Sequence, residues 1–472
     1  MTATATCKTN PLKCLVRWAK GISPSIFLFG SALLAIILAN SGLSTAYFRI
    51  LQSPVQVSIG DWSLFQTGGR QMTVAEFIND GLMALFFFSV GLEINRELLV
   101  GSLSNMKQAL MPVLAAIGGM AMPVLVFLTI EHTYPAMHGM AIPMATDIAF
   151  SLAVLGLLGD RVPITVKVFL MAFAVVDDIG GILVIAIFFS SGIKLVPLML
   201  GMMTLALAYY LGKRGVVKRG VFYFIGGIMW LCFLHSGVHT TIAGALLALT
   251  IPHKPTVRLP ELQEDVDMLK SKISAAIERQ ERNEVRDFVP QCEVEEMRKT
   301  EKRINRTMNP IQLMCEEMTF FVHYIVLPFF AFANSGVVLR GMGLSSFTGV
   351  TLAVALGLIV GKPLGIFGIT YILNKLKVVK YPPGMTTANL FGVSIFGGIG
   401  FTVSLFIATL AYADMGAVGT DLLNQAKIGI FLGTIVSSFV GYYTLKSILK
   451  YEYAHGKGAN CPEYHKYIKG EK

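Results

Sequence analysis

Two adjacent aspartates, Asp177 and Asp178, lie in the middle of an apolar stretch that runs from residue 165 to residue 190. Because a charge near the centre of a bilayer is costly, carboxylates in such a stretch are candidates for function. Burial and repulsion between neighbouring carboxylates both favour the protonated acid. A carboxyl group balanced between its protonation states can hold either a proton or a small cation. The pair is therefore a candidate site for proton/cation exchange.

Two further ionisable residues lie in other apolar stretches, Asp147 in residues 139–158 and Lys362 in residues 346–373. Since consecutive helical residues point about 100° apart, the two adjacent aspartates cannot both face one partner. We expect one of them to face an ion pathway and the other to pair with Lys362 in a medium of low dielectric. An ion pair with a purely architectural role would leave the second aspartate and Asp147 unexplained.

Helix-breaking residues accompany two of these stretches. Gly139 and Pro143 precede Thr146 and Asp147, and the stretch at 385–413 contains three closely spaced glycines, Gly397, Gly398 and Gly400. Interrupted helices in corresponding positions of two halves are a pointer to a transporter site at the bilayer midplane. We expect Asp147 to neutralise the positive ends of the broken helices and Lys362 the negative ends. Close helix packing through small residues is the alternative explanation of the glycines.

Four other residues are secondary candidates for ion or proton binding: Asp80, Glu93, Glu97 and His239. Asp80 lies in the outer part of the stretch at 74–92, where it could instead form local hydrogen bonds. Glu93 and Glu97 lie at the other end, where they could attract cations or form an ordinary salt-bridge cluster with Arg96. His239 belongs to a residue type that titrates near neutral pH, but it could equally be a packing residue.

The elements that carry these residues are predicted to be membrane helices. Of the 472 residues 54% are hydrophobic and only 14% are charged, against about 25% charged in a soluble domain. Twelve apolar segments are each interpreted as one span, which predicts an all-α polytopic membrane protein. They lie at about 24–41, 74–92, 107–129, 139–158, 165–190, 194–212, 221–236, 237–252, 315–339, 346–373, 385–413 and 423–449. The first is expected to be a retained helix rather than a cleaved signal.

The basic residues show the orientation of these spans. With the sides alternating at each span, 33 of the 39 Lys and Arg residues fall on the side of both termini. By the positive-inside rule we expect both termini to be cytoplasmic. The net charge of +10 therefore reflects topology, and we expect no nucleic-acid partner. The expected layout is a cytoplasmic N-terminus (1–23), eight spans (24–252), a charged cytoplasmic insert (253–310), four spans (311–450) and a cytoplasmic tail (451–472).

Two smaller features complete the layout. Residues 54–66 alternate in polarity around Gly60-Asp61, which predicts a β-hairpin on the outer face. Since an isolated hairpin is marginally stable, we expect it to pair with another subunit. The six cysteines show no zinc or redox spacing, and we expect no cofactor.

An ordered set of motifs resembles the NhaA family of bacterial sodium/proton antiporters. The matching segments cover nearly all the spans and lie at 78–83, 91–93, 145–150, 176–180, 237–244, 330–336, 361–365 and 398–402. The resemblance implies twelve helices with inverted repeats formed by spans 3–5 and 10–12, in which spans 4 and 11 are broken and cross. It also implies that Asp177 and Asp178 bind Na+ (or Li+) and protons, that Thr146 and Asp147 help to form the site, and that Lys362 pairs within it.

The resemblance further implies electrogenic exchange of about two protons for one sodium ion, in the bacterial inner membrane, by homodimers in which the outer hairpin takes part. The sequence departs from the family pattern in three places. The histidines that usually enter span nine are replaced in residues 315–321, Asn95 stands where a lysine is usual, and the insert at 253–310 is absent from shorter members. These departures affect the expected pH response rather than the ion site.

Three other classes of protein were weighed against an antiporter. An intramembrane aspartyl protease needs its two carboxylates on different helices in a Gly-x-Gly-Asp context, whereas Gly398-Ile399-Gly400 is followed by Phe401. A cation channel needs a continuous wet path lined by rings of ligands. A sodium-coupled solute symporter is the nearest alternative, and it differs in requiring an organic solute.

Overall fold

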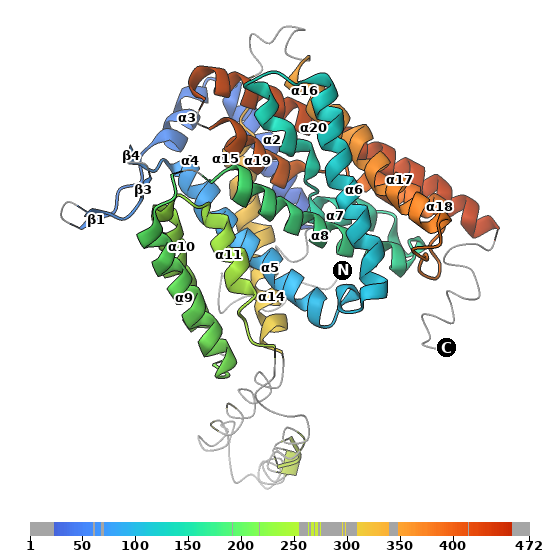
Figure 1. Cartoon of the computed structure of the whole chain (residues 1–472), viewed down its shortest axis with the longest axis horizontal. Helices are drawn as coiled ribbons and strands as arrows, with labels where there is room; N and C mark the ends of the chain where they lie inside the picture. The colour runs from blue at the N-terminus through green and yellow to red at the C-terminus, as the bar shows by residue number, and fades with distance from the viewer. Residues whose placement is uncertain are drawn as a thin grey trace, which may run out of the picture.

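The computed structural model describes residues 23–59, 62–67, 70–190, 192–216, 218–253, 309–338, 348–413 and 415–455, together with isolated positions between 263 and 298. Most of the expected N-terminal segment, cytoplasmic insert and C-terminal tail lies outside these residues. The described part of the chain is a bundle of helices with four short strands at one edge (Figure 1).

The first half of the bundle contains the adjacent aspartates and the first broken segment. In chain order its helices are α2 (Pro24–Ala39), α3 (Ser44–Gln52), α4 (Val74–Phe77), η1 (Ile78–Leu82), α5 (Met83–Leu99), η2 (Ser102–Ser104), α6 (Met106–Ile130), η3 (Ala136–Met144), α7 (Ile148–Gly156), η4 (Gly159–Arg161), α8 (Ile164–Phe188), α9 (Leu195–Lys213), α10 (Arg219–Ser236) and α11 (Thr240–Ala248).

The second half contains Lys362 and the glycine-rich segment. Its helices are α14 (Pro310–Phe321), η5 (Val322–Val326), α15 (Leu327–Asn334), α16 (Val350–Leu356), η7 (Gly357–Gly361), α17 (Lys362–Lys375), α18 (Thr387–Phe396), α19 (Phe401–Tyr412) and α20 (Gly416–Ala454).

The described helices confirm a polytopic membrane protein but not a count of twelve spans. Eight continuous helices are long and apolar enough to cross a bilayer, and three bent pairs raise the number of candidate spans among the described residues to at most eleven. The eighth expected segment corresponds to α11, whose nine residues are too few to cross a bilayer alone. Helix α11 starts after Gly237, a residue with a φ of 80° that ends α10.

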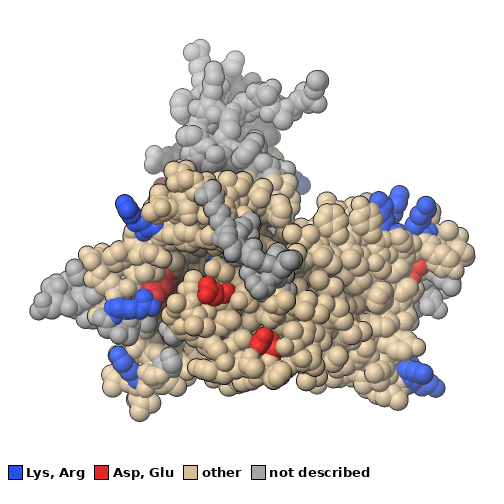
Figure 2. All heavy atoms as spheres, turned by 90° about the horizontal axis from the view of Figure 1, so that it is seen from above, with Lys and Arg blue, Asp and Glu red and all other residues tan. Residues whose placement is uncertain are grey.

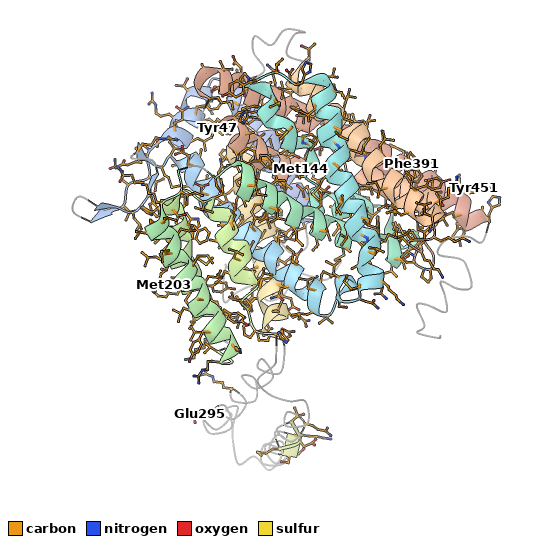
Figure 3. All side chains as sticks on the ribbon, in the orientation of Figure 1. Tyr47, Met144, Met203, Glu295, Phe391 and Tyr451 are labelled. Atoms are coloured by element: carbon orange, nitrogen blue, oxygen red, sulfur yellow. The ribbon has the colours of Figure 1, made fainter. Side chains whose placement is uncertain are left out.

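The surface of the molecule fits a polytopic membrane protein. Met203 on α9 lies at the edge of the bundle and is 66% exposed, whereas Met144 lies among the central helices (Figure 3). Seen from above, uncharged atoms form most of the visible surface, and the Lys and Arg side chains lie towards its edges (Figure 2). An exposed apolar surface of this extent is expected where lipid replaces water.

Both segments that were predicted to be interrupted are bent. The helix η3, a 3₁₀ helix that contains Pro143, meets α7 at 44°, and α18 meets α19 at 48°. Extended residues separate the first pair, and Gly397 to Gly400 separate the second. A Cβ atom on Gly398 would lie 2.4 Å from the carbonyl oxygen of Leu358. Close packing therefore accompanies the break, so both explanations given for these glycines apply.

Three π-helical turns occur among the described helices: η1, η5 and η7. Two of these turns precede a proline, whose ring clashes with the carbonyl group four residues earlier. For Pro328 that carbonyl belongs to Tyr324, inside η5, and for Pro363 it belongs to Ile359, inside η7. The wider π turn relieves this clash and directs the following residues to new positions. Turns of this kind are frequent at functional sites.

Helix α17 packs closely against α6 through two glycines. A Cβ atom on Gly118 would lie 2.4 Å from the carbonyl oxygen of Gly365, and one on Gly365 would lie 2.1 Å from that of Gly118. Only glycine at both positions allows the two backbones to approach this closely. This contact fixes the depth of α17, and with it the position of Lys362 at the first residue of that helix.

The region of the predicted outer hairpin contains two short antiparallel pairs, β1 (Ser58–Ile59) with β2 (Trp62–Ser63) and β3 (Gln66–Thr67) with β4 (Arg70–Gln71). The turn expected at residues 60 and 61 lies outside the described residues. The strands lead into α4, whose N-terminus is closed by a capping box between Thr73 and Glu76. The strand region projects from one edge of the bundle (Figure 1).

Candidate ion-binding site

Asp177 and Lys362 form a fully buried ion pair. The Nζ atom of Lys362 donates a hydrogen bond to Oδ2 of Asp177 at 2.6 Å, and neither side chain is exposed. The lysine also lies over the ring of Phe173, 5.4 Å from its centroid. Of the two aspartates that could meet the lysine, the structure places Asp177 opposite it. That Lys362 also compensates the negative ends of the broken helices stays a prediction.

Asp178 is buried but has no protein partner for its carboxylate. It is 3% exposed, and neither of its oxygens has a hydrogen-bond partner among the described residues. The second oxygen of Asp177, Oδ1, is also without one in this part of the chain. A buried polar group without a partner is costly, so these three carboxylate oxygens are available to a proton, a water or an ion.

A cavity of about 220 Å³ connects Asp178 to the C-terminal part of α5. Its ionisable lining residues are Asp178, Asp147, Glu93, Arg96, Glu97 and His323. Arg96 and Glu97 form an ion pair at 3.8 Å, which is one contact of the salt-bridge cluster considered for these residues. The glutamates nevertheless line the same cavity as Asp178, on a route by which a cation could approach it.

Asp147 accepts hydrogen bonds from the N-terminal ends of two half-helices. Its Oδ1 accepts from the backbone N–H of Phe150 in α7 at 3.0 Å. Its Oδ2 accepts from the backbone N–H and the hydroxyl of Thr402 in α19, at 3.1 and 2.7 Å. Helix N-termini carry a partial positive charge, so this buried carboxylate lies where the N-terminal ends of α7 and α19 meet.

The C-terminal end of α18 is joined to the start of α7 at the same place. Thr146 donates to the carbonyl oxygen of Gly397 at 2.9 Å, and Ser151 donates to that of Phe396 at 3.0 Å. The backbone N–H of Asp147 donates to the carbonyl oxygen of Ile399 at 2.7 Å. Thr146 also lies beside Asp177. The two broken segments therefore hold each other at the ion pair.

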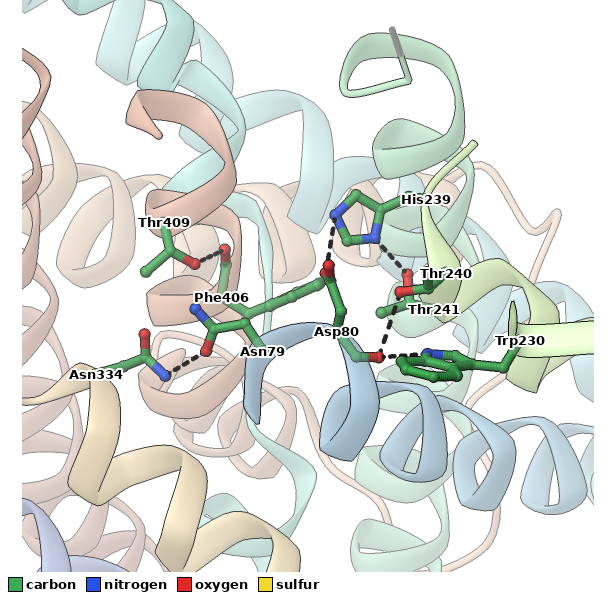
Figure 4. A network of polar contacts seen from close by, with 9 residues as sticks. All are labelled: Asn79, Asp80, Trp230, His239, Thr240, Thr241, Asn334, Phe406 and Thr409. Atoms are coloured by element: carbon green, nitrogen blue, oxygen red, sulfur yellow. Dashed lines mark hydrogen bonds and ion pairs between the residues drawn. The ribbon is translucent and has the colours of Figure 1, made fainter. Parts of the chain in front are cut away.

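Asp80 and His239 lie together in a second polar cluster (Figure 4). The Nε2 atom of His239 is 3.9 Å from Oδ1 of Asp80. The backbone carbonyl of Asp80, in the π turn η1, accepts from Trp230 at 3.1 Å and Thr240 at 3.3 Å. The cluster is thus held by α4–α5, α10 and α11, and its side-chain carboxylate is only partly exposed.

A group of phenylalanine rings borders this cluster. The ring of His239 packs edge-on against Phe406, with centroids 5.6 Å apart. Phe406 is fully buried and also contacts Phe87 and Phe330, at centroid distances of 5.9 and 6.2 Å. Phe406 belongs to α19, one turn from Thr402, so the same half-helix reaches both the site at Asp147 and the cluster at His239.

His323 was not among the residues predicted from the sequence. It lies in the π turn η5 and lines the cavity together with Glu93 and Asp178. Its Nδ1 is hydrogen-bonded to the carbonyl oxygen of Thr319 at 2.7 Å. The signal that could have found it is its position as a titratable residue within the apolar stretch at 315–339.

Among the described residues, no group of three or more His, Cys, Asp or Glu is arranged to hold a metal ion. Buried carboxylates where two broken helices meet, in a multi-pass membrane protein, define a transporter rather than an enzyme.

The family model described as Na+/H+ antiporter 1 matches residues 18–445, and the chain belongs to this family. It is 44% identical to the Na(+)/H(+) antiporter NhaA of Parabacteroides distasonis, over 93% of this chain and 97% of that protein. It is 46% identical to the NhaA of Porphyromonas gingivalis, over 91% and 94% of the two chains. The NhaA of Shigella dysenteriae is 38% identical, over 91% and 96%.

One departure from the family pattern has a structural explanation. Asn95 replaces the usual lysine of α5, and its Nδ2 donates to the carbonyl oxygen of Ala248 at 3.0 Å. It therefore joins α5 to the C-terminal end of α11. The family pattern in residues 315–321 lacks its histidines here, but His323 places an imidazole in the cavity one helical turn further along.

Proposed function

We propose that this protein is a sodium(lithium)/proton antiporter that expels Na+ in exchange for external protons. Sodium binds between Asp177 and Asp178, and protons compete with it for the same carboxylates. The observation that carries the proposal is the unsatisfied carboxylate of Asp178, which is buried and lines a cavity beside the Asp177–Lys362 pair. The names of the related antiporters give the same two substrates.

Exchange is electrogenic, with about two protons for each sodium ion. Two titratable units support this ratio, the Asp178 carboxyl group and the Asp177–Lys362 pair. Each can take up one proton when sodium leaves. Each cycle carries one positive charge in one direction as sodium and two in the other direction as protons. Net positive charge therefore moves in the direction of the protons.

Transport proceeds by alternating access, and the conformation described here opens inward. The cavity at Asp178 extends to Glu93 and Glu97, which the distribution of basic residues assigns to the cytoplasmic side. Phe406 packs against Phe87 and His239, and in this proposal these rings close the route towards Asp80. In the outward-facing state this closure opens and the Asp80–His239 cluster receives the ions.

The finer architecture belongs to the same proposal. Spans 3–5 and 10–12 form inverted repeats, which the similar bends of 44° and 48° in the two broken pairs support. Both termini are cytoplasmic in the bacterial inner membrane. Two copies form a homodimer through the outer strand region at 54–66.

The direct test is a proton-gradient assay in inverted membrane vesicles, in which Na+ or Li+ is added without any organic solute. An antiporter dissipates part of the gradient when the cation is added, and a sodium-coupled symporter does not. If sodium leaves the gradient unchanged at every pH from about 6 to 9, the protein is not a sodium/proton antiporter.

A further inference from the structure

Glu452 is a buried carboxylate at the far end of α20, the longest of the described helices. It lies in the last turn of α20 and is only 4% exposed. At 1.5 Å per residue the 39 residues of α20 extend about 58 Å, well beyond the roughly 30 Å hydrocarbon core of a bilayer. Acidic side chains are rarely this buried unless they are paired. Specific partners must therefore stabilise Glu452.

Those partners are the first residues of α18. The hydroxyl of Thr386 donates to Oε1 of Glu452, and the side-chain amide of Asn389 donates to Oε2 at 2.8 Å. Thr386 is also the N-cap of α18, because its hydroxyl oxygen accepts from the backbone N–H of Asn389 at 3.0 Å. A carboxylate is favoured beside the positive end of a helix. Glu452 thus fastens the N-terminus of α18 to α20.

The other end of α18 reaches the ion site. The carbonyl oxygens of Phe396 and Gly397 accept hydrogen bonds from Ser151 and Thr146, next to the buried ion pair. Because α18 has ten residues, it is a rod of about 15 Å with one end at Glu452 and the other at Thr146. A shift of its N-terminus therefore moves the carbonyl group of Gly397 relative to Thr146.

We propose that Glu452 is a positioning residue of the ion site, which acts through α18. It holds the N-terminus of α18 against α20 and so fixes the end of the broken helix that contacts Thr146. The inference rests on the proposed exchange function, because its effect is on cation binding. A purely structural anchor would instead change only how much protein folds and how stable it is.

The test uses the full-length protein in inverted vesicles and measures three quantities: the apparent KM for sodium, the maximal exchange rate and the melting temperature. Glu452→Gln keeps the shape and lets the amide groups re-pair, but removes the charge. Lys450→Gln, on the exposed face of the same helix end, is the matched control. We expect Glu452→Gln to raise the apparent KM about threefold to tenfold, as a small misplacement of a binding group does. The control stays within about twofold of the wild type.

A double-mutant cycle with Thr386→Val keeps the proposal testable if the single variants lose stability. If Glu452 acts through α18, the KM effects of Glu452→Gln and Thr386→Val are not additive, since both break the same contact. The proposal is overturned if Glu452→Gln lowers the melting temperature but leaves the KM of the remaining protein unchanged. It is also overturned if Lys450→Gln raises the KM equally. Failure of the exchange function itself would appear separately, as an absence of sodium-dependent proton movement in the wild type.

Discussion

Replacing Lys362 with methionine removes the cation from an ion pair in which neither side chain is exposed. Methionine fills most of the space of the lysine stem but carries no charge. Asp177 is then left either as an unpaired buried carboxylate or as a neutral acid. The cost of either state falls on the folded protein, because an unfolded segment can expose the aspartate to water.

The charged and the neutral state of Asp177 are expected to cost similar amounts of folding free energy. Removing one partner of a buried ion pair costs about 3–5 kcal/mol. Protonating a carboxyl group that has a pKa of about 3.9 in water costs about 1.4 kcal/mol for each pH unit above that value, or about 4 kcal/mol at pH 7. We therefore expect Lys362→Met to lose about 4 kcal/mol of stability at pH 7.

The loss also depends on pH with a defined sign. In the variant, the folded state keeps a proton on Asp177 that the unfolded state releases at neutral pH, so stability falls as pH rises. At pH 5 the cost of protonation is only about 1.5 kcal/mol. The difference between wild type and variant should therefore shrink as pH is lowered from 7 to 5.

The assay is thermal unfolding of the purified protein in detergent at both pH values. Lys375→Met, at the exposed C-terminal end of the same helix α17, is the control and should change stability by less than about 0.5 kcal/mol. The double variant Asp177→Asn/Lys362→Met removes both charges and should recover much of the loss. The reasoning is wrong if Lys362→Met and Lys375→Met have the same melting temperature at pH 7. It is also wrong if the double variant is less stable than Lys362→Met.

Two further predictions concern residues that contact the cavity. Asp147→Ala removes the side-chain caps of α7 and α19 together and should lower the stability of the folded protein by about 2–4 kcal/mol. Asp147→Asn keeps one hydrogen-bond acceptor and should lower it less. Equal melting temperatures for the two variants would contradict the capping role. His323→Gln replaces the imidazole that lines the cavity with Glu93 and Asp178 by an amide. It should change the apparent KM for sodium about twofold to fivefold, and an unchanged KM would count against a cation route through this cavity.

The sequence contains enough information to predict the polytopic helical class and the buried ionisable residues, because charges are rare in an apolar background and each must be stabilised. It also predicts the two breaks, since Pro143 and the glycines at 397–400 disrupt regular helix. It does not decide which aspartate meets Lys362, because the rotation of a helix is set by its neighbours. Here the close approach of α17 to α6 and the π turn before Pro363 place the lysine at Asp177.

Other features depend on tertiary contacts that no local pattern records. The expected span at 237–252 is the short helix α11, which packs against α5 and does not need to cross the bilayer alone. Glu452 belongs to the predicted cytoplasmic tail (451–472), and its burial against α18 depends on a contact with Asn389 that is distant in sequence. His323 was detectable as an intramembrane histidine, but its position in the cavity depends on the π turn ahead of Pro328.

Sodium-induced charge movement in proteoliposomes that contain the purified protein tests the central claim most directly. With equal pH on both sides and no organic solute, a sodium gradient should drive net positive charge opposite to the sodium flux in the wild type. Asp178→Asn, which should fold because the Asp177–Lys362 pair is intact, should abolish this current. A wild type without current, or a current that persists in folded Asp178→Asn, would contradict exchange of sodium and protons at Asp178.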